Sequence, residues 1–174
     1  MKRKPNILWI VCVFFVFGCA AFVNDPEIRE KSGTLPPRGK FRIEFTGFKY
    51  YKNEMQFLRV ELWKKGYEED PRSDSVLEIV LEESEPEYTY PRLHRLNFFL
   101  TLFTLGILPY HINSDHRVVY RFLNKTGIEY ETTHGLSLDQ WRGILTIPIM
   151  PSFWPSSSFE KSLSRSLDLL EKRE

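Results

Sequence analysis

Two stretches of the chain alternate apolar and polar residues in the way that β-strands do. Phe41, Ile43 and Phe45 alternate with polar neighbours, and the same alternation recurs over residues 57–63. Successive side chains of a strand point to opposite faces, so both stretches are predicted to be strands with one buried face. The aliphatic run at 76–81 predicts a third strand.

A β-hairpin is predicted further along the chain. Residues 118–123 and 128–132 are rich in β-branched and aromatic side chains, and they flank the turn sequence 124–127. Gly127 can adopt the positive φ that a tight turn requires. Residues 143–148, which end in a proline, predict one more strand.

Residues 96–105 are almost all apolar and predict a hydrophobic helix that Gly106 and Pro109 end. A helix that is apolar on every side is either buried inside a fold or in contact with lipid, and a short strand is a third interpretation. At about 15 Å, such a helix is too short to cross a hydrocarbon layer of about 30 Å.

The C-terminal region predicts an amphipathic helix that ends near residue 172. Phe159, Leu163, Leu167 and Leu170 recur at helical spacing, with charged residues opposite them. Strands interrupted by helices favour an α+β fold, with a single antiparallel sheet and the helices packed on one of its faces. A small β-sandwich or an open barrel is the alternative. Residues 40–174 are expected to form one such domain.

The N-terminus has the three parts of a secretory signal. Basic residues at 2–4 are followed by an apolar run at 7–17 and by small residues at 18–21. The apolar run is only about 11 residues long, too short to span a bilayer as a helix. The sequence therefore predicts an exported protein.

Val16–Cys19, with the sequence Val-Phe-Gly-Cys, resembles the lipobox of bacterial lipoproteins. Phe17 stands where the common pattern has a small or β-branched residue, and relaxed boxes of this kind resemble those of spirochaetes. The resemblance implies that residues 1–18 are removed as a signal peptide and that the sulfur of Cys19 carries a diacylglycerol. Ordinary cleavage after Ala20, giving a secreted protein, and an uncleaved anchor are the alternatives.

Cysteine count and charge support this interpretation. The only cysteines are Cys12 and Cys19, so an exported domain would contain no disulfide and its first cysteine is available for lipid. Lys+Arg number 24 and Asp+Glu 23, a balance that argues against nucleic-acid binding. Residues 19–39, which are rich in proline, glycine and alternating charges, are predicted to form a flexible tether between the lipid and the domain.

The sequence contains little that points to catalysis. It has neither a His-Glu-x-x-His pair nor a Gly-x-Ser-x-Gly motif, so an enzyme is not expected and no cofactor is implied. His111, Asp115 and His116 are the only local cluster of metal-ligand types, and a polar turn explains them equally well.

Two groups of aromatic residues are candidate binding features. Trp141, Phe153 and Trp154 flank a proline-rich segment and are candidates for a surface that meets a protein partner or a membrane. Phe99 and Phe103 are candidates for lining an apolar pocket, as in a carrier of a lipid-like ligand.

The sequence therefore predicts a lipid-anchored protein of the bacterial cell envelope, on the outer membrane or a periplasm-facing membrane. Its expected role is binding, structure or assembly. A secreted protein is the alternative.

Overall fold

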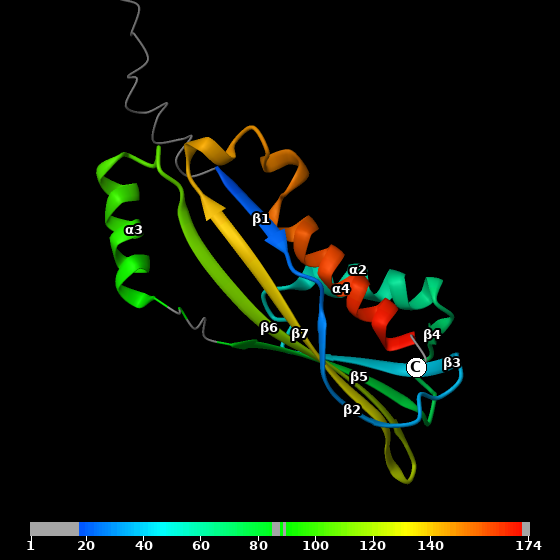
Figure 1. The fold of residues 1–174 in the computed structure, drawn as a ribbon. Coiled ribbons are helices and arrows are strands. Elements are labelled where there is room, and N and C mark those ends of the chain that lie inside the picture. The colour runs from blue at the N-terminus through cyan, green and yellow to red at the C-terminus, as the bar shows by residue number, and fades with distance from the viewer. Residues whose placement is uncertain (1–17, 85–87, 89, 172–174) are drawn as a thin grey trace, which may run out of the picture. The chain divides into compact units, whose positions relative to one another are not determined.

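The computed structural model describes residues 18–84, 88 and 90–171. The strands are β1 (Cys19–Val23), β2 (Glu27–Gly33), β3 (Gly39–Thr46), β4 (Tyr67–Glu69), β5 (Val76–Ser84), β6 (Tyr110–Asn124) and β7 (Gly127–Arg142). The helices are α2 (Lys52–Lys64), α3 (Pro91–Phe103) and α4 (Pro155–Glu171), together with short 3₁₀ turns at Ile144–Thr146 and Met150–Ser152 (Figure 1).

The strands form one sheet in the order β1-β7-β6-β5-β3-β4, and β2 also pairs with β7. β5 runs antiparallel to β6, whereas β3 runs parallel to both β5 and β4. The predicted α+β class is confirmed, and the sheet is mixed where a purely antiparallel one was expected. The predicted hairpin is confirmed as β6 and β7, joined by a two-residue turn.

The strand predicted at 57–63 is wrong, because this segment belongs to α2. Two parallel neighbours such as β3 and β5 need a crossover connection, and a helix usually supplies it. Leu58 and Leu62 are fully buried, while Val60 is exposed. Positions 58 and 62 fit a period of two as well as a helical spacing of four, so the alternation was ambiguous. The strand predicted at 143–148 is also wrong, since a 3₁₀ turn lies there.

The irregular tether predicted at 19–39 does not match the structure. β1 and β2 occupy much of this segment, and Ala20 and Ala21 are completely buried. β2 pairs antiparallel with residues 130–135 of β7. Its seven residues are all exposed, so hydrogen bonds between backbones, not an apolar face, hold it in the sheet.

The described residues group into two compact units. Unit 1 contains residues 18–22, 88–114 and 138–158, and unit 2 contains residues 23–84, 115–137 and 159–171. β6 and β7 each contribute one end to either unit.

Unit 2 has a well-filled core between its strands and two helices. Figure 1 shows α2 and α4 beside each other, and Lys65 Nζ at the end of α2 donates to Asp168 of α4 over 2.6 Å. The apolar residues of α4 are buried as predicted. Three serines spaced four residues apart, Ser158, Ser162 and Ser166, are buried on the same side of the helix. The largest fully buried side chains are Leu58, Leu62, Tyr67, Leu77, Ile79, Tyr120, Phe122, Leu136, Leu163 and Leu167.

A polar cluster lies within this core. The hydroxyls of Tyr120 and Ser166 are 2.7 Å apart, and Ser166 Oγ donates to the Leu163 carbonyl. His134 is fully buried beside the Tyr120 ring, and its Nε2 lies 3.0 Å from Thr132 Oγ1. Burial lowers the pKa of His134 from 6.5 to about 4, so the imidazole is neutral in the folded protein near neutral pH.

The buried His134 predicts acid sensitivity of unit 2. Between pH 6.5 and 4 the unfolded chain binds a proton on this imidazole that the folded chain does not, so the free energy of unfolding falls as the pH drops. The expected loss from this group is up to about 3 kcal/mol. Denaturant unfolding at a series of pH values should show a shallower pH dependence for His134→Gln than for wild type. Equal slopes for His134→Gln and wild type would refute the assignment.

Candidate functional site

Helix α3 turns its apolar residues outward and its polar residues toward the protein. The three least exposed positions in its first eleven residues are His94, Asn97 and Thr101, which follow the i, i+3, i+7 spacing of a single stripe. In a helix of a soluble domain this stripe is normally the apolar one. α3 therefore has the reverse polarity of a helix that packs on a core.

Hydrogen bonds within unit 1 fix this orientation. Asn97 Nδ2 donates to the Pro109 carbonyl and Asn97 Oδ1 accepts from the His111 backbone N–H, each over 3.1 Å. The Tyr110 hydroxyl lies 2.6 Å from His94 Nε2. Thr101 Oγ1 donates to the Asn97 carbonyl, which satisfies its hydroxyl inside the helix. The polar stripe is thus bonded to the segment that follows α3.

Of the three interpretations of residues 96–105, the buried helix and the strand are wrong, because most of this segment lies in α3 with its apolar side chains exposed. Phe99 is 52% exposed and Phe103 81% exposed, and neither is among the lining residues of the two cavities of about 390 and 630 Å³ near the start of α3. Their exposure shows that the two rings lie on the surface of α3 and are not enclosed in a core. The other large apolar side chains exposed on α3 and the following turn are Leu93, Leu96, Phe98, Leu100, Leu102, Leu105, Ile107 and Leu108.

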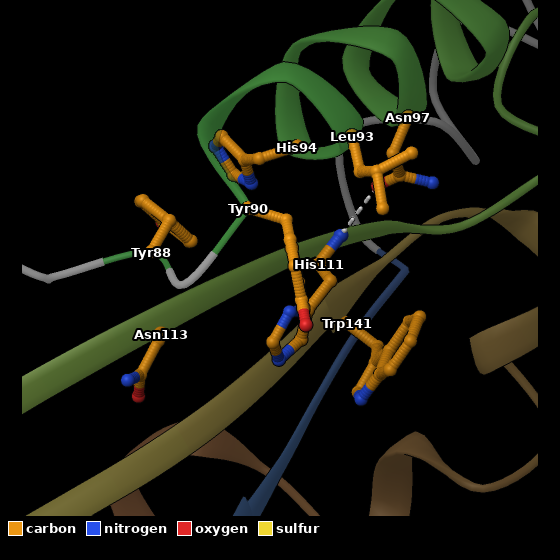
Figure 2. A pocket seen from close by; sticks show the side chains of 8 residues that line it. All are labelled: Tyr88, Tyr90, Leu93, His94, Asn97, His111, Asn113 and Trp141. Atoms are coloured by element: carbon orange, nitrogen blue, oxygen red, sulfur yellow. Dashed lines mark hydrogen bonds between the residues drawn. The ribbon is translucent and has the colours of Figure 1, made fainter.

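A second feature of unit 1 is an open pocket of about 390 Å³ near the start of α3. Figure 2 shows His94 and Tyr88 on one side of it and His111 with Trp141 on the other. The remaining lining residues are Tyr90, Leu93, Asn97 and Asn113. The pocket is thus formed mainly by planar rings with a few amide groups, a composition suited to binding a flat or ring-shaped ligand.

Ring contacts hold the pocket walls in place. Tyr88 stacks on His94 with ring centroids 3.7 Å apart, and His111 lies 4.6 Å from the Trp141 ring. His111 Nε2 donates to Asp139 Oδ1 over 3.0 Å. Two sequence candidates, His111 and Trp141, are therefore brought together, and the pairing of β6 with β7 is what places them side by side.

Proton positions follow from burial. Desolvation raises the pKa of Tyr110 and lowers the pKa of His94, and the neighbouring His111 lowers the latter further. Near neutral pH the pair is a neutral phenol and a neutral imidazole, and the tautomer of His94 decides which of the two groups donates the hydrogen bond. The His111–Asp139 pair has the geometry that orients a general base, but no serine, threonine or cysteine is among the described residues that line this pocket.

The three candidate metal ligands, His111, Asp115 and His116, have separate partners. His111 bonds to Asp139, whereas His116 lies 3.0 Å from the Tyr51 hydroxyl in unit 2. Asp115 pairs through its backbone with Ser84 of β5. Among the described residues no group of three or more His, Cys, Asp or Glu side chains could hold a metal ion.

The other candidate residues have different surroundings. Phe153 packs on Phe22 with ring centroids 4.8 Å apart, and its carbonyl accepts from the Ala21 N–H. Trp154 is 45% exposed, so it is the only one of the Trp141, Phe153 and Trp154 group that is largely free to meet a partner. Cys19 is half-buried at the start of β1.

Sequence reasoning missed the residues that orient α3. His94, Asn97 and Thr101 are the polar positions around an apolar run, and their common helical stripe was a readable signal. Tyr88 and Tyr90, which line the pocket, and Asp139, which is bonded to His111, carried no such signal, because only tertiary contacts place them there.

We predict that the charge of His111 acts on His94. In a His111→Gln variant the pKa of His94 should rise toward its ordinary value of 6.5, because the repulsion between the two imidazoles is removed while the desolvation of His94 stays. NMR titration of the histidine ring protons measures this directly. His134→Gln, which alters a histidine of unit 2, should leave the titration of His94 unchanged, and an unaltered pKa in His111→Gln would show that the two groups are not coupled.

No protein-family model matches the chain, and no curated protein is similar in sequence. Among solved structures, two dodecamers of PelC from Paraburkholderia phytofirmans are similar, at 10% and 9% sequence identity and TM-scores of 0.45 and 0.46. Each alignment covers 86% of this chain and 99% of the PelC chain. Similarity of this extent assigns neither a family nor an activity, so the function is argued from the residues of this chain.

Proposed function

We propose that the protein is an exported, lipid-anchored protein of the bacterial cell envelope that works by binding and not by catalysis. The observation that carries the binding role is the apolar side of α3, which is exposed while the polar side is bonded to the protein. Contiguous exposed apolar surface on a folded domain marks a site of interaction with protein or membrane.

The position of β1 supports cleavage before Cys19. A cut at that point leaves the whole of β1 in the mature chain and removes Gly18, whose carbonyl accepts one hydrogen bond from the Gly143 N–H. A cut after Ala20 would remove two of the five residues of β1, including the fully buried Ala20. Processing at Cys19 is therefore the cleavage that best preserves the sheet.

A lipid on Cys19 would hold unit 1 close to the membrane. A flexible tether of twenty residues could separate the lipid from the folded domain by about 70 Å. Because β1 begins at the lipidated residue itself, the separation between the lipid and the sheet is about one residue, or roughly 3 Å. Two or more acyl chains, at about 0.8 kcal/mol per buried methylene, give stable attachment without any help from a polybasic segment.

A binding role also fits the pocket of unit 1. Its walls are stacked rings and amides, and the His111–Asp139 pair has no nucleophile beside it among the lining residues. The arrangement supplies surfaces for contact but lacks the convergent groups that acyl or phosphoryl transfer requires.

The anchor predicts a defined N-terminus. Intact mass of the protein from its own host should correspond to a chain that starts at Cys19 and carries diacylglycerol, and the protein should partition into detergent. Cys19→Ala should accumulate as an unprocessed precursor, because both modification and cleavage need the thiol. Cys12→Ala changes the other cysteine of the leader and should be processed normally. A wild-type chain that starts at Ala21 without added acyl mass would contradict the proposal.

A further inference from the structure

We propose that α3 and the turn after it form a second membrane contact, in which the helix lies in the interface of a phospholipid bilayer with its apolar side among the acyl chains. Which leaflet the helix contacts depends on the lipid anchor proposed above, but the contact itself does not need the anchor. The proposed occupant of this surface is a lipid bilayer and not a protein.

The outward face of α3 has the composition of an interfacial helix. Arg92, Arg95, Phe99 and Phe103 follow the i, i+3, i+7, i+11 spacing of one stripe, opposite the bonded stripe of His94, Asn97 and Thr101. Both arginines are exposed and stand in the first two turns, and the apolar residues follow them. The helix therefore presents cations at one end of its outward face and large apolar side chains along the rest.

Charge favours a lipid surface as the occupant. Between Glu87 and Asp115 the chain has no acidic residue, although Asp and Glu number 23 in all. A cavity of about 630 Å³ lies beside the two arginines and is lined by Tyr90, Pro91, Arg92, Leu93 and Arg95. Guanidinium groups beside an aromatic ring at the edge of an apolar surface match the phosphates of a bilayer interface.

The same charge pattern argues against a second copy of the chain. In a two-fold dimer the same patch meets itself, so Arg92 and Arg95 of one copy would face a patch without any carboxylate. A protein partner would need acidic groups placed around an apolar groove, whereas the phospholipid interface offers anions and an apolar phase side by side.

The turn after α3 continues the apolar surface without unpaired backbone groups at its centre. Leu105 has a positive φ of 51°, which directs the chain back while its side chain stays 60% exposed. The Gly106 N–H donates to the Thr101 carbonyl over 2.7 Å, and the Leu108 N–H donates to Thr104 Oγ1. A turn whose backbone donors are bonded internally can enter an apolar phase at little cost.

The length of the helix limits how deep it goes. No described helix is both long and apolar enough to cross a membrane, and the 13 residues of α3 correspond to about 20 Å. Arginines at the first turns would stay at the level of the phosphates, so Phe103 and Leu105 at the other end would lie deepest. α3 thus dips into one leaflet.

The test uses vesicle binding by a chain without acyl groups. Residues 19–174 with Cys19→Ser retain every strand and helix described here, and far-UV circular dichroism confirms that each variant is folded. Sedimentation with vesicles of phosphatidylethanolamine and phosphatidylglycerol should show binding. Phe99→Ser combined with Phe103→Ser should lower the partition coefficient by roughly tenfold or more, because two phenyl rings no longer leave water.

Matched controls separate α3 from general hydrophobicity and charge. Trp63→Ser with Ile128→Ser removes two exposed apolar residues of unit 2 and should leave binding unchanged. Arg92→Gln with Arg95→Gln should weaken binding to anionic vesicles more than to phosphatidylcholine vesicles, whereas Lys49→Gln with Arg72→Gln, elsewhere on the surface, should have a much smaller effect.

Three results would overturn the inference. The first is absence of vesicle binding by the parent chain, and the second is equal binding by the Phe99/Phe103 variant. The third is self-association of the parent chain in solution that this variant abolishes and that added vesicles do not change. The last would assign the surface to a second copy. Failure of lipidation at Cys19 in the host would leave these vesicle results unaffected, so the two proposals stand or fall separately.

Discussion

The orientation of α3 depends on the side chain of Asn97. Its amide donates to the Pro109 carbonyl and accepts from the His111 backbone N–H, so it closes the helix onto the chain that leads into β6. A half-buried amide with both groups bonded is costly to displace, because its separated partners would be left without hydrogen bonds in a partly desolvated place. As long as these two hydrogen bonds hold the polar stripe against the protein, the apolar residues of α3 must point away from it.

The two units of the chain differ in what stabilises them. Unit 2 has aliphatic and aromatic side chains buried between its strands and α2 and α4, and even its polar cluster around His134 is enclosed. Unit 1 is held largely by hydrogen bonds and ring contacts, such as Tyr110 with His94 and Phe22 with Phe153. An ordinary core in one unit stabilises that part of the chain, while the other unit leaves its apolar residues available for binding.

Sequence patterns predicted the elements whose side chains separate into a buried and an exposed set. β3, the β6–β7 hairpin and α4 are of this kind. β2 was missed because all its residues are exposed and only backbone pairing makes it a strand. α2 was misread because Leu58 and Leu62 fit both periods. For α3 the helix was predictable but its surroundings were not, since a uniformly apolar run does not reveal which side meets the protein. Contacts such as Trp141 with His111 arise only from strand pairing.

Entry of the side of α3 opposite Asn97 into lipid is what a measurement must test. The most direct measurement is spin-label EPR on the vesicle-bound chain, with labels placed singly at the exposed positions from 92 to 103. The ratio of oxygen to nickel-chelate accessibility gives the depth of each label. We expect shallow labels at 92 and 95 and the greatest depth at 99 and 103. Labels at 99 and 103 that stay accessible to the water-soluble chelate in the presence of vesicles would contradict this expectation.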